Sequence, residues 1–166
     1  LDLEVSAAGK IPKMEGATTL FLVLKPSFTS STGKMFMELG DITVYDNKIM
    51  HGATWTSLDF SDGNPKILTL SMQRSTRHKT SYIPHLKIID SSLFSIAELV
   101  YYPRLSSREQ IKMVNTYLAI KYSVPITGVS DKDWRDYLAA DSTRYWDYTT
   151  DKMYSLRVLG LGRSAS

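Results

Sequence analysis

The sequence predicts a mainly β protein, an antiparallel sandwich followed by one C-terminal helix and a short extension. Two observations support this prediction. Short apolar segments separated by turn residues fill the first hundred positions, which is typical of antiparallel strands. Near residue 106 the apolar period changes to three and four residues, which indicates a helix. A length of 166 residues suits one such domain with an appendage.

The first strand signal is the apolar run at 18–25, TTLFLVLK, which Pro26 and a Ser-Thr-Gly stretch bring to an end. Its apolar side chains point to both faces, with three leucines on one face and Phe21 and Val23 on the other. A strand of this kind belongs in the middle of a sheet, covered on both sides.

Further strands are predicted along the chain up to residue 102. Residues 42–45 and 48–50 flank Asp46-Asn47, a pair that tolerates the positive φ angles of a tight hairpin turn. A second turn cluster, DFSDGNP at 59–65, precedes a strand at 67–72 with one apolar and one polar face. The last two predicted strands lie at 86–89 and 94–102.

The predicted helix begins at Ser106-Ser107-Arg108-Glu109, which has the spacing of a capping box. In that arrangement Ser106 and Glu109 each accept a hydrogen bond from the other's backbone N–H. An apolar stripe follows, made of Ile111, Val114, Leu118 and Tyr122. Because the stripe needs an apolar surface, we expect the helix to pack on the sandwich.

After Pro125 the chain becomes more polar and more aromatic. We expect Asp131-Lys132-Asp133 to cap a short helix that carries Trp134, Tyr137 and Leu138, and a last strand at 156–161. The aromatic residues expected to pin this segment to the sandwich are Trp134, Tyr137, Tyr145 and Trp146. The predicted organisation is therefore a sandwich with its closing helix over 1–122 and an extension packed on it over 123–166.

The segment 96–122, IAELVYYPRLSSREQIKMVNTYLAIKY, resembles the closing strand and following helix of bacterial concanavalin A-like, laminin G-like domains of the lectin/glucanase kind. The matching positions are Ile96, Ala97, Glu98, Leu99, Val100, Tyr102, Leu105, Ser106, Tyr117, Leu118, Lys121 and Tyr122. The later segments 137–142, 145–147 and 159–163 resemble a C-terminal segment that often follows such domains in large exported Bacteroidota surface proteins. Lys25-Pro26 is similar to the end of the family's early strand.

The resemblance implies a concanavalin A-like jelly roll in a secreted or cell-surface protein of adhesin type. Family members usually carry a hairpin with a V-N-G turn, whereas the corresponding region, 73–84, is short and basic here. The resembling proteins continue beyond Gly162-Arg163, so we expect this chain to be a fragment. Residues 1–4 do not look like a signal peptide, so an exported protein would have lost its signal.

Composition argues against several classes of partner. The net charge of +3 arises from 20 basic and 17 acidic residues that are spread along the chain. The densest basic cluster is Arg74, Arg77, His78 and Lys79, which has no interleaved aromatic residue and is interpreted as a solvated hairpin tip. We therefore expect no nucleic-acid partner. No apolar run approaches the ~18 residues of a membrane-spanning helix, so we expect no membrane insertion. The absence of cysteine excludes disulfides and thiol nucleophiles.

The sequence also argues against catalysis. A retaining glycosidase needs two carboxylates about 5 Å apart, and the E-x-D-x-x-E pattern of sandwich glycosidases is absent. Glu98 has the most suggestive position, and we interpret it as a structural hydrogen-bonding residue. The histidines show neither metal-ligand nor triad spacing. The alternatives to a binding module are a polysaccharide-active glycoside hydrolase of the same fold and a purely structural spacer.

The expected function is a non-catalytic module that binds a glycan or a surface protein, or that scaffolds other domains of its parent chain. Trp55, Tyr45 and Tyr82 could stack on sugar rings if they lie on an exposed sheet face; the alternative is a place in the core. Calcium is the one cofactor considered, through Asp59, Asp62 and Asn64. A plain turn is the favoured interpretation of that cluster.

Overall fold

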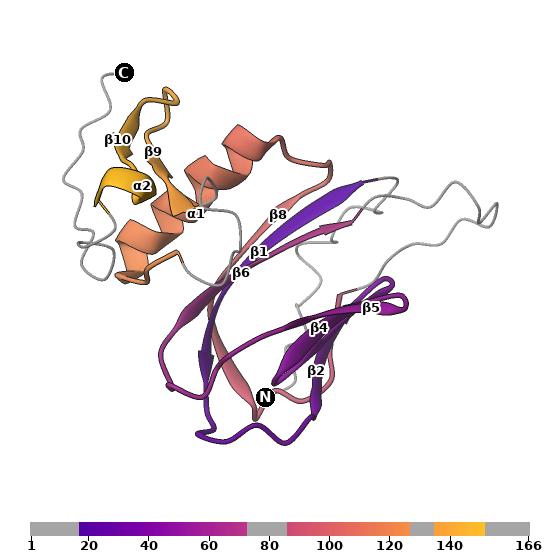
Figure 1. The fold of residues 1–166 in the computed structure, drawn as a ribbon. Helices are drawn as coiled ribbons and strands as arrows, with labels where there is room; N and C mark the ends of the chain where they lie inside the picture. Colours follow the sequence, from indigo (N-terminus) through magenta and orange to yellow (C-terminus); the bar gives the residue numbers. More distant parts are fainter. Residues whose placement is uncertain (1–16, 73–85, 127–134, 152–166) are drawn as a thin grey trace.

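The computed structural model describes residues 17–72, 86–126 and 135–151, and strands predominate in them (Figure 1). The elements in chain order are β1 (Thr18–Pro26), β2 (Met35–Leu39), β3 (Ile42–Tyr45), β4 (Lys48–His51), β5 (Thr54–Ser57), β6 (Lys66–Met72), β7 (Leu86–Ile88), β8 (Phe94–Tyr102), α1 (Arg108–Tyr122), β9 (Tyr137–Leu138), β10 (Arg144–Trp146) and α2 (Tyr148–Asp151). The predicted mainly β class with a C-terminal helix is confirmed.

Two antiparallel sheets make up most of the fold. One has three strands in the order β6-β1-β8, and the other has five in the order β5-β4-β3-β2-β7. The three-stranded sheet lies between the five-stranded sheet and α1, and the β9-β10 ribbon lies on the far side of α1 (Figure 1). The structure is therefore layered, with α1 in contact on two sides.

Strand β1 is buried along both faces because it is the middle strand of its sheet. Leu20, Leu22 and Leu24 point into the core shared by the two sheets, while Phe21 and Val23 point toward α1. This confirms the prediction for 18–25. The polar face predicted for 67–72 is only partly correct, because α1 reaches over β6. The Thr69 hydroxyl donates a hydrogen bond to Asn115 Oδ1 on the helix at 2.9 Å.

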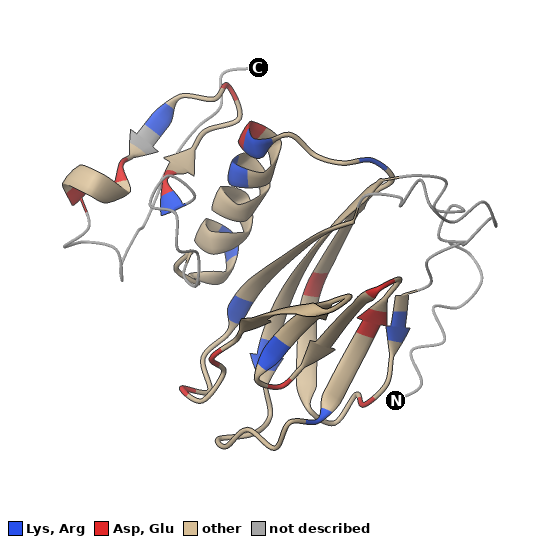
Figure 2. Cartoon of the chain, turned by 45° about the vertical axis from the view of Figure 1, so that its right-hand side comes forward, with Lys and Arg blue, Asp and Glu red and all other residues tan. Residues whose placement is uncertain are grey.

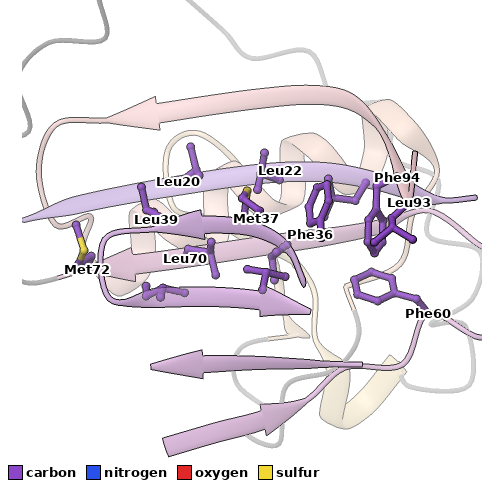
Figure 3. Close-up of a cluster of buried hydrophobic side chains, with 14 residues drawn as sticks. Leu20, Leu22, Phe36, Met37, Leu39, Phe60, Leu70, Met72, Leu93 and Phe94 are labelled. Carbon is purple, nitrogen blue, oxygen red and sulfur yellow. The ribbon is translucent and has the colours of Figure 1, made fainter. Parts of the chain in front are cut away.

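The core between the sheets contains a cluster of phenylalanine rings at one end (Figure 3). The Phe94 ring centroid lies 4.3 Å from that of Phe36 and 4.9 Å from that of Phe60. Phe60 belongs to the predicted turn cluster 59–65, and its buried ring anchors that turn to the core. The turn is thus fixed by packing as well as by its glycine and proline.

Two strands, β2 and β5, were not predicted. A register shift between Met35 and Met37 leaves both Phe36 and Met37 buried, so β2 lacks a regular alternation. Strand β5 is exposed along its whole length and has no apolar face to detect.

The predicted hairpin is formed by β3 and β4, but Asp46-Asn47 does not adopt positive φ angles. Among the described residues other than glycine, positive φ occurs at Ser123 and Ser142. In the neighbouring turns it falls on Gly40 and Gly52, at 64° and 57°. The Asp46 side chain instead holds the turn by hydrogen bonds that are described below.

Helix α1 begins one residue later than predicted. Its N-cap is Ser107, whose hydroxyl accepts from Gln110 N–H while the Gln110 side chain accepts from Ser107 N–H. The Ser106–Glu109 capping box is therefore wrong. Ser106 is buried and its backbone N–H donates to Thr19 Oγ1 at 2.9 Å, which ties the linker to β1.

The apolar stripe of α1 packs on the three-stranded sheet, as predicted. Leu118 is fully buried against Phe21 and Val23. The partly buried residues around this second cluster are Ile67, Val100, Tyr102, Ile111, Val114 and Tyr122. No helix in the described parts of the chain has the length and apolarity needed to cross a membrane.

The extension differs from the prediction in two ways. Tyr137 and Leu138 form strand β9 and not a helix, because Leu138 N–H donates to Thr116 Oγ1 of α1 and Tyr137 pairs with Trp146 of β10. The described part of the extension packs mainly on α1, which separates it from the sheet. Trp134 and the predicted strand at 156–161 lie outside the described residues, as does the basic cluster at 74–79.

Candidate functional site on the outer face of the five-stranded sheet

The five-stranded sheet has one face in the core and one face toward solvent. Strand pairing aligns a row of outward-facing side chains across all five strands, because cross-strand partners share a face. The row is Lys87, Glu38, Thr43, Met50 and Trp55. It ends at the tryptophan on the edge strand β5.

A second row on the same face contains Tyr45. The register pairs Met35 with Tyr45 and Lys48 with Ser57, and the 46–47 turn places Tyr45 beside Lys48. Tyr45 on β3 and Trp55 on β5 are therefore two strands apart, about 10 Å across the sheet at the usual strand spacing. The structure places two of the three predicted ligand-binding residues on one exposed face. Tyr82 lies outside the described residues.

Trp55 is not a core residue. Its exposed fraction is 64%, the largest among the large apolar side chains of the described residues. Tyr45 is half-buried, and the Lys48 ammonium lies over its ring at 5.0 Å from the centroid. The two aromatic rings and the ammonium thus occupy neighbouring positions on this face.

The strands of the five-stranded sheet carry three charged residues, Glu38, Lys48 and Lys87 (Figure 2). Lys87 Nζ lies 3.9 Å from Glu38 Oε2, on the same face but toward the opposite edge of the sheet from Trp55. Within the described residues Lys48 forms no ion pair, and its polar contact is with the Tyr45 ring. The Trp55 side of the face therefore carries a local positive charge.

Asp46 lies in the turn beside Lys48, but its carboxylate is turned toward the loop at 31–33. Its two oxygens accept hydrogen bonds from Ser31 Oγ at 3.0 Å, Thr32 N at 2.7 Å, Thr32 Oγ1 at 3.0 Å and Gly33 N at 2.9 Å. Burial raises the pKa of Asp46, but these hydrogen bonds outweigh it and the net shift is downward. The Asp46 carboxylate is thus held by neutral donors of the 31–33 loop, which stabilise its charged form.

The carboxylates considered as calcium ligands accept hydrogen bonds from residues of their own turn. Asp59 Oδ1 accepts from Ser61 N at 2.9 Å, and Asp62 Oδ1 accepts from Asn64 N at 3.0 Å. Asp62 Oδ2 also accepts from Lys66 Nζ at 2.6 Å, which is the main cause of the lowered pKa of Asp62. Within the described ranges no group of three or more His, Asp or Glu residues could hold a metal ion. These carboxylates shape two consecutive turns.

Glu98 connects β8 to α1. Its carboxylate accepts a hydrogen bond from Lys121 Nζ at 2.9 Å, and this contact is the main reason that the pKa of Glu98 is lowered. The neighbouring Tyr122 hydroxyl donates to Ala97 O at 3.3 Å. The structure therefore brings together the glutamate of the closing strand and the Lys-Tyr end of the helix, which are the two motifs on which the family resemblance depends.

A groove of about 710 Å³ lies at the open edge of the fold, where β6 and β5 end their sheets. Its walls are formed by the apolar residues Ile49, Phe60 and Ile67 and by the polar side chains of Thr56 and Asn115. Sequence analysis missed this groove. No local sequence pattern predicts the groove, because its presence depends on how far the two sheet edges separate.

The C-terminal part of the chain matches a family model. Residues 110–166 match a domain of unknown function, DUF8202. The search of the curated proteins and the search of the solved structures gave no match. The matched segment starts inside α1 and continues through the extension.

The described part of the matched segment is held together by charged residues on the outer side of α1. Asp136 is buried, and its Oδ2 lies 3.5 Å from Lys112 Nζ and 3.4 Å from Arg144 Nε. Its other oxygen accepts from Tyr148 N at 3.0 Å. Asp147 accepts from Thr149 and from Arg144, and these contacts lower its pKa to about 2. The two carboxylates, Asp136 and Asp147, thus have structural partners within this segment.

Proposed function

We propose that this chain is a non-catalytic, glycan-binding module of a secreted or cell-surface bacterial protein. The observation that supports the proposal most directly is Trp55, which lies exposed on the outer face of the five-stranded sheet with Tyr45 on the same face. An indole ring offers a flat apolar surface on which the C–H face of a sugar ring can stack. A protein ligand is the alternative occupant of this face.

The fold also supports the proposal. Two antiparallel sheets on one shared core, followed by a helix that packs on the smaller sheet, suit a concanavalin A-like jelly roll. The closing strand and helix carry the residues that resemble this family. We propose that the chain is such a domain followed by the C-terminal segment of large exported Bacteroidota surface proteins. This fold supports many functions, so the exposed aromatic residues carry the functional argument.

The environment of Glu98 argues against a role as the acid of a glycosidase. A glycosidase acid must hold its proton near neutral pH, which requires a raised pKa. The pKa of Glu98 is lowered, with Lys121 as the main cause, so its carboxylate is charged at neutral pH. Glu98 also faces α1, which covers that side of its sheet.

A glycan array combined with a reducing-sugar assay tests the proposal. We expect the purified chain to bind at least one glycan without releasing sugar, and Trp55→Ala to abolish that binding. Tyr117→Ala is the matched control, because Tyr117 is also an exposed aromatic residue but lies on α1.

The other outcomes identify the alternatives. Sugar release that disappears in Glu98→Gln would show that the chain is a glycoside hydrolase. Binding that survives Trp55→Ala would remove the proposed platform. If the folded chain binds neither a glycan nor a surface protein, the remaining alternative is a purely structural spacer.

A further inference from the structure

We infer that the saccharide bound at this face is acidic, with a carboxylate that pairs with Lys48. This inference rests on the proposed glycan-binding function and names the class of ligand. A uronic acid residue stacked on Trp55 would carry its carboxylate directly on the stacked ring. The group that receives the carboxylate must therefore lie beside the tryptophan.

Lys48 occupies that position. Trp55 pairs with Met50 on β4, and Lys48 is the next outward-facing residue of the same strand. Such a diagonal neighbour lies about 7–8 Å away, within reach of a long side chain. The Tyr45 ring holds the Lys48 ammonium at 5.0 Å from its centroid, so the charge is kept on this face.

The other described charges near this position already have partners of their own. Glu38 and Lys87 pair with each other across β2 and β7. The Asp46 carboxylate accepts four hydrogen bonds from the 31–33 loop. Lys48 is left as the cation whose partner would come from the ligand. A neutral sugar at this place would partly desolvate the ammonium without supplying an anion, which is unfavourable.

Matched pairs of ligands test the inference. The probes are oligogalacturonate, oligomannuronate and an oligoglucuronate, each compared with its methyl ester, in which the same sugar lacks the charge. We expect the wild-type chain to bind at least one acid about tenfold more tightly than its ester, as a charge-assisted hydrogen bond allows. Added salt should reduce this preference.

The variants separate the contributions of charge and ring. Lys48→Gln should lower the affinity for the acid to that for the ester, whereas Lys87→Gln, on the same face but paired with Glu38, should leave the preference intact. Trp55→Ala should weaken binding of both forms. Unchanged melting temperatures would show that each variant is folded.

Equal affinity of the wild type for acid and ester, or an acid preference that survives Lys48→Gln, would overturn the inference while leaving glycan binding in place. Tighter binding of sulfated sugars than of any uronate would also overturn it, because the anion would then be of another class. Absence of binding to every saccharide, neutral or acidic, would reject the proposed function itself.

Discussion

Asp46 illustrates how one side chain replaces a backbone conformation. The sequence Asp46-Asn47 suggested a hairpin turn built on positive φ angles, and neither residue adopts them. The buried carboxylate instead collects donors from the 31–33 loop and joins two segments that are distant in the sequence. The residue types were sufficient to predict a turn. The long-range partners of Asp46 could not be predicted, because nothing near the turn points to that loop.

The first prediction concerns this carboxylate. Asp46→Asn should lower the free energy of unfolding at neutral pH by about 1–3 kcal/mol, because an amide group turns its own N–H toward donors that need an acceptor. Chemical denaturation measures this loss. Asp41→Asn, an exposed carboxylate in the preceding turn, should have little effect.

The pH dependence of that loss has a defined sign. Because the pKa of Asp46 is lowered on folding from its ordinary value of 3.8, its stabilising contribution is complete above that value. The contribution should disappear as the pH falls below 3.8 and through the folded pKa. Denaturation curves should therefore show a larger difference between wild type and Asp46→Asn at pH 6 than at pH 3. An equal difference at both pH values would contradict this account.

Trp55 shows what residue-level reading of the sequence could not decide. On sequence alone an aromatic residue of this kind fits both an exposed platform and the core, which is the commoner place. Its exposure follows from β5 being the edge strand, which depends on the strand order of the whole sheet. The sequence could supply the candidate residue, and the topology supplies its environment.

At the scale of elements, α1 and β1 were predictable because each has a regular pattern. The residues of β1 are apolar on both faces, and the structure covers both. Strand β2 escaped prediction because a bulge breaks its alternation, and β5 because no residue in it is buried. Pattern reading thus works where an element has a constant environment along its length.

The helix stripe makes a prediction at this scale. Leu118→Ala should reduce the free energy of unfolding by about 2–5 kcal/mol, because the side chain is fully buried between α1 and β1. Tyr117→Ala, one position away on the exposed side, should cost less than about 1 kcal/mol. Thermal or urea denaturation measures both. Equal effects of the two substitutions would show that the helix does not dock as described.

The start of α1 can be tested with two adjacent serines. Ser107→Ala should cost about 0.5–2 kcal/mol, since its hydroxyl caps the helix. Ser106→Ala should cost less, because the described contact of Ser106 with Thr19 uses the backbone N–H, which the substitution preserves. Urea denaturation measures both losses. A larger loss for Ser106→Ala than for Ser107→Ala would support Ser106 as the N-cap, as the sequence predicted.

At the scale of the whole molecule, the extension is attached through a buried ion pair on α1. Asp136→Asn should remove the partner of Lys112 and destabilise the attachment by about 3–5 kcal/mol. Hydrogen exchange should then speed up in 137–151 before it does so in β1. The double variant Lys112→Met with Asp136→Leu should recover much of the loss, because it buries no unpaired charge.

Asp141→Asn serves as a control for this experiment, because Asp141 is exposed and accepts hydrogen bonds from Thr143 of its own turn. Exchange rates in 137–151 that are unchanged in Asp136→Asn would show that other contacts attach the extension.

The position of α1 has a consequence for inheritance. The DUF8202 match begins at residue 110, so the apolar stripe of α1 belongs to the matched segment. The residues on which the stripe packs, Phe21 and Val23, lie outside that segment. The matched segment therefore contains one side of an interface, and we expect the other side to occur with it. Other chains that contain this segment should have, earlier in the sequence, a strand able to cover the stripe. A chain that lacks such a strand would have to obtain the missing half from another molecule.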